Sequence, residues 1–229
     1  IQLNENLKSL GCDAFSQCDN LETIYWNAKN ANNFYEGKNY SLTCGTFKNY
    51  YSSGNYDNYW YGVDNNNAAV FSGSGSNNGG LNFVFGDTVE RIPAYLTSIG
   101  GASIKSVSIG KNVTKIGKDA FINSANLKEV NIKDVAQICN MVYEGSTDLD
   151  INYEANPVYY ADTLYLNGEL LTDLVIPEGI THIIDYAFYG IRNIETVSIP
   201  GTVVAMGENS FRGCNNITEM NVSANNTMY

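Results

Sequence analysis

Hydrophobic residues recur along this 229-residue chain in a fixed frame around four phenylalanines. Phe15, Phe121, Phe188 and Phe211 each follow an alanine or a serine, with an apolar residue five positions before and another six positions after. Nine positions after each phenylalanine begins an apolar–other–apolar triplet, as in residues 197–199. Alternation with period two is the pattern of a β-strand with one buried face. The frame therefore predicts a short strand on one side of each repeat and the phenylalanine on the returning side.

The strand pattern occurs eight times, and most neighbouring copies start 23 or 24 residues apart. This period is typical of leucine-rich repeats. A three-residue strand cannot bury its own apolar face, but copies stacked about 4.8 Å apart form a parallel sheet over a shared interior. We therefore predict one α/β-type repeat solenoid over residues 1–229. It should be a right-handed leucine-rich-repeat fold of short parallel strands and turns, with little helix and one large loop insertion.

Two longer intervals predict insertions, at residues 28–80 and 134–172. Each should hold one degenerate coil, which brings the solenoid to about ten coils. The first insertion adds a large loop, and the second adds a short helix near 135–142 and a hairpin. Asn167-Gly168 between alternating apolar residues is a strong signal for that hairpin. Thr97 stands where a core phenylalanine is expected, which predicts a distorted turn over 93–104.

Several segments resemble the BspA-type leucine-rich repeat family. They are Gly117-Lys118-Asp119-Ala120-Phe121, Asp185-Tyr186-Ala187-Phe188-Tyr189-Gly190 and Asn193-Ile194-Glu195-Thr196-Val197-Ser198-Ile199-Pro200. The resemblance covers nearly the whole chain except about residues 28–80. It implies a secreted or cell-surface protein, often of a host-associated bacterium, that serves in adhesion or ligand capture. It supplies no catalytic motif.

The charge and composition of the chain limit the classes of partner that it can bind. The net charge of −11, with only 13 Lys and Arg, argues against binding to nucleic acid or to anionic membranes. No apolar run is long enough to insert into a bilayer. We expect a monomer without a cofactor or metal, whose partner is an extracellular protein or a carbohydrate. Because the chain starts at Ile1 without an export signal, we expect it to be a fragment of a longer protein.

The first candidate site is the outward face of the strands. The middle residue of each strand points outward in this fold and would contribute to one continuous, mostly uncharged surface. A glycan or an extended peptide could hydrogen-bond to it; the alternative is a merely solvated sheet face. The candidate residues are Tyr25, Ser108, Asn131, Ser198 and Asn221.

The second candidate site is the loop over residues 50–67, which is rich in Tyr, Asn, Ser and Gly. Tyr56, Tyr59, Trp60 and Tyr61 crowd its centre. Such residues make adaptable contact surfaces in antibody paratopes, and aromatic rings also stack on sugars. The alternative is that these rings pack the insertion onto the solenoid.

Catalysis is not indicated. The single histidine, His182, is expected in an exposed turn, and Asp148 and Asp150 are expected in a solvated loop. Cys18 and Cys214 share one repeat position and should be buried thiols that lie too far apart to bridge. The disulfide state of the other three cysteines, at positions 12, 44 and 139, stays open. We therefore predict a non-catalytic ligand-binding or adhesion module rather than an enzyme; the alternative is a passive scaffold that presents neighbouring domains.

Overall fold

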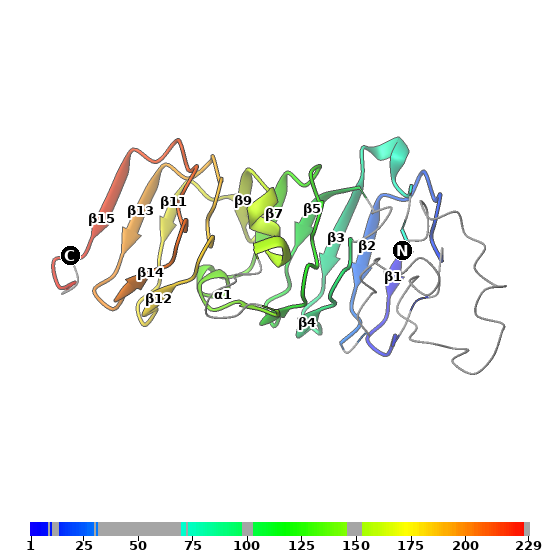
Figure 1. Cartoon of the computed structure of the whole chain (residues 1–229), viewed down its shortest axis with the longest axis horizontal. Helices are drawn as coiled ribbons and strands as arrows, with labels where there is room; N and C mark the ends of the chain where they lie inside the picture. Colours follow the sequence, from blue (N-terminus) through cyan, green and yellow to red (C-terminus); the bar gives the residue numbers. More distant parts are fainter. Residues whose placement is uncertain are drawn as a thin grey trace.

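The computed structural model describes residues 1–8, 10, 14–29, 31, 70–71, 73–97, 103–145 and 153–226. They coil into an elongated solenoid whose axis runs horizontally in Figure 1, with the N-terminal coils on the right and the C-terminal coils on the left. The predicted repeat solenoid is confirmed.

The main face consists of parallel strands, one from each coil. Six of them pair in chain order, with one register shift between β3 and β5: β1 (Gln2–Leu3), β2 (Thr23–Trp26), β3 (Leu81–Phe85), β5 (Ile104–Ser108), β7 (Glu129–Ile132) and β9 (Thr163–Leu166). Three more form a separate parallel sheet: β11 (Asp173–Val175), β13 (Thr196–Ile199) and β15 (Glu219–Val222). All eight strands predicted from the periodicity are present, and β9 supplies the degenerate coil expected in the second long interval.

The first long interval differs from the prediction. Strand β2 pairs directly with β3, with Ile24 opposite Phe83, so no strand lies between them. The expected degenerate coil at this point is therefore wrong, and nine strands of this kind stack in the described part instead of about ten. Phe71, which precedes β3 in the chain, stacks its ring on Phe15 with centroids 5.6 Å apart.

A second set of strands lines the lower edge of the solenoid in Figure 1. It comprises one sheet of β4 (Arg91–Ile92), β6 (Lys115–Ile116) and β8 (Val142–Tyr143), and a pair of β12 (His182–Ile183) and β14 (Ala205–Met206). In three of these strands, β4, β6 and β12, the second residue is buried and faces the core. Two-residue strands are too short to show a period-two pattern, so the repeat frame did not predict them.

The predicted hairpin forms and divides the main face. Asn167 and Gly168 have φ angles of 54° and 87°, which suits a type I′ turn between β9 and β10 (Glu169–Leu170). Because β10 occupies the free edge of β9, β11 starts a new sheet. The Asn193 side chain spans this break: its Oδ1 accepts from the Leu164 amide at 2.8 Å, and its Nδ2 donates to the carbonyls of Leu164 at 2.9 Å and Leu171 at 2.6 Å.

The core follows the phenylalanine frame. Phe121 and Phe188 are fully buried. Phe15 and Phe211 are partly buried, because each lies in a terminal coil that has a described neighbour on one side only. Phe211 stacks on Phe188 with ring centroids 5.3 Å apart and 14° between the ring planes. Aromatic rings from successive coils therefore share one interior.

Helix is sparse, as predicted. The expected short helix is α1 (Val135–Cys139), whose N-cap Asp134 accepts a hydrogen bond from the Ala136 amide. The other helical turns are η1 (Ser76–Asn78), η2 (Tyr153–Ala155) and α2 (Pro157–Tyr160).

Thr97 is accommodated in the core without distortion of residues 93–97. Its hydroxyl donates to the carbonyls of Ala120 at 3.2 Å and Ile122 at 2.7 Å, which satisfies a polar group that is 3% exposed. The distorted turn expected over 93–104 is therefore regular over its first five residues. Residues 98–102 lie outside the described part.

Candidate functional site

The outward residues of the first sheet lie side by side, as the sequence predicted. Tyr25 pairs with Val84 and Val84 with Ser108. Tyr25 is 49% exposed, and the other two side chains are partly exposed. Tyr25 and Ser108 are thus correctly placed on one surface, two strands apart.

A second outward row lies two residues earlier on the same strands. Ser106 Oγ donates to Asn82 Oδ1 at 2.7 Å, and Asn82 Nδ2 donates to Thr23 Oγ1 at 3.4 Å. These bonds hold three neutral side chains across β2, β3 and β5. We call the two rows together the strand face; it consists of Thr23, Tyr25, Asn82, Val84, Ser106 and Ser108.

Asn131 pairs with Ser108 and therefore continues the outward row onto β7. Its Oδ1 accepts from the Gly168 amide at 2.9 Å and so supports the hairpin. The other two predicted residues do not extend this face. Ser198 and Asn221 lie on the second sheet, where Asn221 Nδ2 donates to Glu219 Oε1 at 3.0 Å. The expected single continuous surface is wrong, because the hairpin ends the first sheet before the second begins.

The loop candidates lie outside the described residues. This holds for Tyr56, Tyr59, Trp60 and Tyr61, as well as for Cys12, Cys44, Asp148 and Asp150. Their proposed roles stay predictions.

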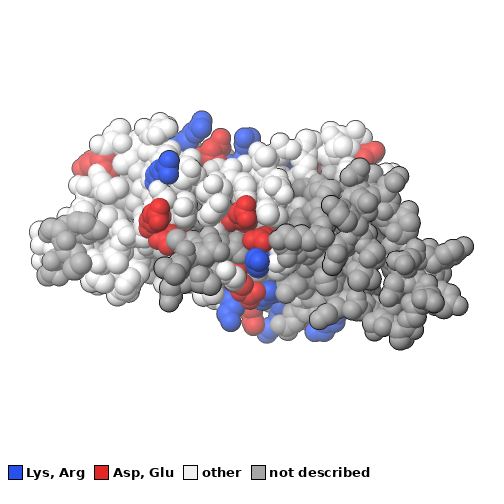
Figure 2. All heavy atoms as spheres, in the orientation of Figure 1, with Lys and Arg blue, Asp and Glu red and all other residues white. Residues whose placement is uncertain are grey.

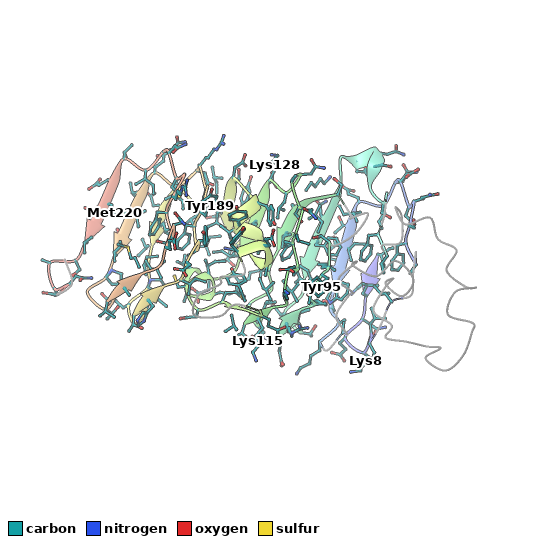
Figure 3. All side chains as sticks on the ribbon, viewed as in Figure 1. Lys8, Tyr95, Lys115, Lys128, Tyr189 and Met220 are labelled. Atoms are coloured by element: carbon teal, nitrogen blue, oxygen red, sulfur yellow. The ribbon has the colours of Figure 1, made fainter. Side chains whose placement is uncertain are left out.

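The structure brings together five tyrosines that the sequence did not single out. We call them the tyrosine cluster; it consists of Tyr153, Tyr159, Tyr160, Tyr186 and Tyr189. Tyr159 is central, with ring centroids 4.7 Å from Tyr153, 4.9 Å from Tyr189 and 5.8 Å from Tyr186. Tyr160 meets Tyr159 edge-on at 5.2 Å. Figure 3 shows Tyr189 between the edges that carry Lys128 and Lys115, nearer to the edge with Lys128.

A buried asparagine joins the two segments of the cluster. Asn156 is 1% exposed and caps α2, where its Oδ1 accepts from the Val158 amide at 2.9 Å. Its Nδ2 donates to the Tyr186 carbonyl at 3.0 Å. The tyrosines of η2 and α2 are thereby fixed against those of the following coil.

Charged groups are spread thinly over the described surface. Figure 2 shows Lys and Arg mainly along the upper and lower edges of this face, without a broad basic area among the described residues. Arg91 and Glu144 form a bidentate ion pair across the sheet of β4, β6 and β8. The hydrogen bond from Arg91 lowers the pKa of the Glu144 carboxyl.

Burial affects the phenols of Tyr159 and Tyr160, which stay neutral at physiological pH. Burial raises the pKa of Tyr159, and the neighbouring phenols of Tyr189, Tyr153 and Tyr186 add to this effect. Burial also raises the pKa of Tyr160.

His182, Cys18 and Cys214, the described residues considered for catalysis, lie in different coils of the solenoid. His182 is exposed as expected, but it lies in strand β12 and not in a turn, and its Nδ1 is 2.9 Å from Thr181 Oγ1. Cys214 is buried as predicted, and its thiol donates to the Phe188 carbonyl. Cys18 is exposed, contrary to the prediction, because it lies in the first coil, which has a described neighbour on one side only.

Two kinds of feature are absent from the described residues. No group of three or more His, Cys, Asp or Glu side chains there is arranged to hold a metal ion. No helix in the same part of the chain has the length and apolarity that crossing a membrane requires.

Comparisons with known proteins agree with the fold. The family model of the BspA-type leucine-rich repeat region matches residues 1–59, 69–150 and 160–229 in six copies. The chain is similar to a leucine-rich cell surface protein from Faecalibacterium prausnitzii. The sequence identity is 17%, the match covers 93% of this chain and 62% of the other, and the TM-score is 0.35. It is also similar to a leucine-rich repeat protein from Eubacterium ventriosum. The sequence identity is 21%, the match covers 68% of this chain and 44% of the other, and the TM-score is 0.32. The chain thus spans less than two thirds of either protein. A search of curated proteins gave no match.

Proposed function

Because the chain belongs to the BspA-type leucine-rich repeat family, we propose that it is a non-catalytic binding module of a secreted or cell-surface protein. In this proposal the module recognises a host protein or a glycan. The proposed location outside the cell and the proposed role in adhesion are supported by the family resemblance and by the Asn-, Tyr- and Gly-rich composition.

The strand face is the observation that carries the proposal. Small neutral side chains cover three neighbouring strands, and Tyr25 stands 49% exposed beside them. The hydrogen bonds between Thr23, Asn82 and Ser106 fix their donors and acceptors before any ligand arrives. Preorganised groups lose less conformational entropy on binding, and an exposed tyrosine is a rigid anchor.

The polar groups of the described part favour binding over chemistry. A hydrolytic site requires a nucleophile, a base and an orienting group within hydrogen-bond reach of one another. His182 is paired with the hydroxyl of its own neighbour at an exposed edge, and the thiol of Cys214 is occupied by a carbonyl.

A binding screen with matched variants tests the proposal. The wild-type chain is immobilised and exposed to an array of extracellular proteins and glycans, and each ligand found is measured again with Ser108→Arg and Tyr25→Ala. We expect at least a tenfold loss of affinity with either variant. Val204→Arg is the control, because it adds the same side chain at an exposed position next to a different sheet.

The outcomes separate the alternatives. Unchanged binding by both strand-face variants would rule out this face as the site. If the wild-type chain binds nothing on the array, the passive scaffold replaces the binding module as the better account.

A further inference from the structure

The tyrosine cluster forms an aromatic surface that the core does not require. Val158 and Phe188, which are fully buried, fill the interior at these two segments. Tyr153 is 37% exposed, and the other four tyrosines are partly exposed. Five rings therefore lie at the surface in mutual contact.

The cluster keeps one tyrosine in an unfavourable backbone conformation. Tyr186 has φ 55°, in the left-handed region. The same turn position holds Tyr95, Asp119 and Asn209 in other coils, with φ 57°, 50° and 54°. Asp and Asn tolerate this conformation, whereas other side chains cost roughly 1–2 kcal/mol there. Tyr95 adopts the same conformation outside the cluster, so this conformation belongs to the repeat turn, and the case for a ligand rests on the contacts between the five rings.

The geometry selects how a ligand can approach. Insertion of a cation or a proline ring between two parallel aromatic rings needs about 7 Å between their planes, twice the usual carbon–carbon contact. The centroids of Tyr159 and Tyr189 are 4.9 Å apart with 23° between the planes, and those of Tyr153 and Tyr186 are 5.3 Å apart. The rings fill each other's space and offer a platform rather than a cage or slot.

The charges select the kind of ligand. The chain has a net charge of −11, and the Glu154 carboxylate acts on the phenols of Tyr159 and Tyr160, so an anionic ligand would be repelled. The phenols themselves are neutral hydrogen-bonding groups around negatively polarised ring faces. A matching ligand is neutral, has one face of C–H groups and carries hydroxyls at its edge.

We propose that the tyrosine cluster binds a neutral carbohydrate. The C–H face of a pyranose ring stacks on the face of Tyr189 that is turned away from Tyr159, and phenol hydroxyls hydrogen-bond to the sugar hydroxyls. Asn156 is a positioning residue, because it ties Tyr186 to the segment that carries Tyr159. This site is distinct from the strand face, and its failure would leave the proposal for that face intact.

Affinity electrophoresis in gels that contain neutral polysaccharides tests the site directly. The probes are soluble glucans, mannans and xylans, and the dissociation constant for one that retards the wild-type chain is then measured by calorimetry with its hexasaccharide. We expect Tyr159→Ala and Tyr189→Ala each to weaken binding tenfold or more. Tyr189→Phe keeps the ring and should lose only two- to threefold.

The controls distinguish a lost site from a lost fold. Val204→Ala removes an exposed side chain that belongs to neither proposed site and should bind as the wild type does. Circular dichroism and the midpoint of urea unfolding should show that Tyr189→Phe is folded. The proposal is overturned if no neutral polysaccharide retards the wild-type chain, if both alanine variants bind like the wild type, or if a polyproline peptide binds the cluster in place of sugars.

Discussion

Asn193 holds the solenoid together where its main face is interrupted. Its amide makes three hydrogen bonds with the backbone of Leu164 and Leu171, at 2.6–2.9 Å. A typical hydrogen bond contributes about 0.5–1.5 kcal/mol net, so Asn193→Ala should lower the free energy of unfolding by about 2–4 kcal/mol. Partial exposure of Asn193 places the expected loss toward the lower end, because water can reach some of the freed groups.

Asn193→Asp is the sharper variant because it keeps the shape of the side chain. The carboxylate still accepts from the Leu164 amide, but it replaces a donor that now bonds two carbonyl oxygens. Those contacts become repulsive, so Asn193→Asp should be at least as destabilising as Asn193→Ala at neutral pH. Asn77→Ala, which removes a single exposed hydrogen bond to Asn20, is the control and should change stability by less than about 0.5 kcal/mol.

Equilibrium urea unfolding and amide hydrogen exchange measure these effects. We expect a lower midpoint for both Asn193 variants and faster exchange of the Leu164 amide in Asn193→Ala. An Asn193→Asp chain as stable as the wild type would refute the reasoning, since it would mean that the two donated bonds contribute nothing.

Three further outcomes follow from contacts in the described part. Arg91 lowers the folded-state pKa of Glu144, so the pair contributes stability above the unfolded carboxyl pKa of about 4.3. This contribution is lost as the pH falls through the lower folded-state pKa, and unfolding midpoints of Arg91→Gln should depend less on pH between 5 and 3. Gly117→Ala should cost about 1–3 kcal/mol or more in urea unfolding, because the new β-carbon would lie 2.2 Å from a backbone nitrogen of the neighbouring coil. In thiol labelling followed by peptide mapping, exposed Cys18 should react within minutes. Buried Cys139, whose pKa burial raises to about 12, should react only after unfolding.

The fold was predictable because its determinants are local and repeated. The offset from Phe188 to Val197 recurs in other coils and placed the strands of the main face correctly. Asn167-Gly168 predicted its hairpin because only a few residues adopt both left-handed conformations. The sequence did not predict that the hairpin separates β11 from the first sheet, because this separation depends on which sheet edge β10 occupies.

The candidate site was predictable only in part. Tyr25 and Ser108 follow from strand alternation alone and lie where they were expected. The tyrosine cluster was missed because its segments do not share the repeat frame. Counting back nine residues from Leu164, as from Val197 to Phe188, reaches Ala155, so the frame does not align Tyr159 with Tyr189.

The central claim is that successive coils share one interior filled by aromatic rings. Urea unfolding of Phe188→Ala tests it most directly, because this ring is fully buried and stacked on Phe211. We predict a loss of about 3–5 kcal/mol, or failure to fold, as for other buried phenylalanines. A loss below about 1 kcal/mol would contradict the claim, since it would place the ring outside the core.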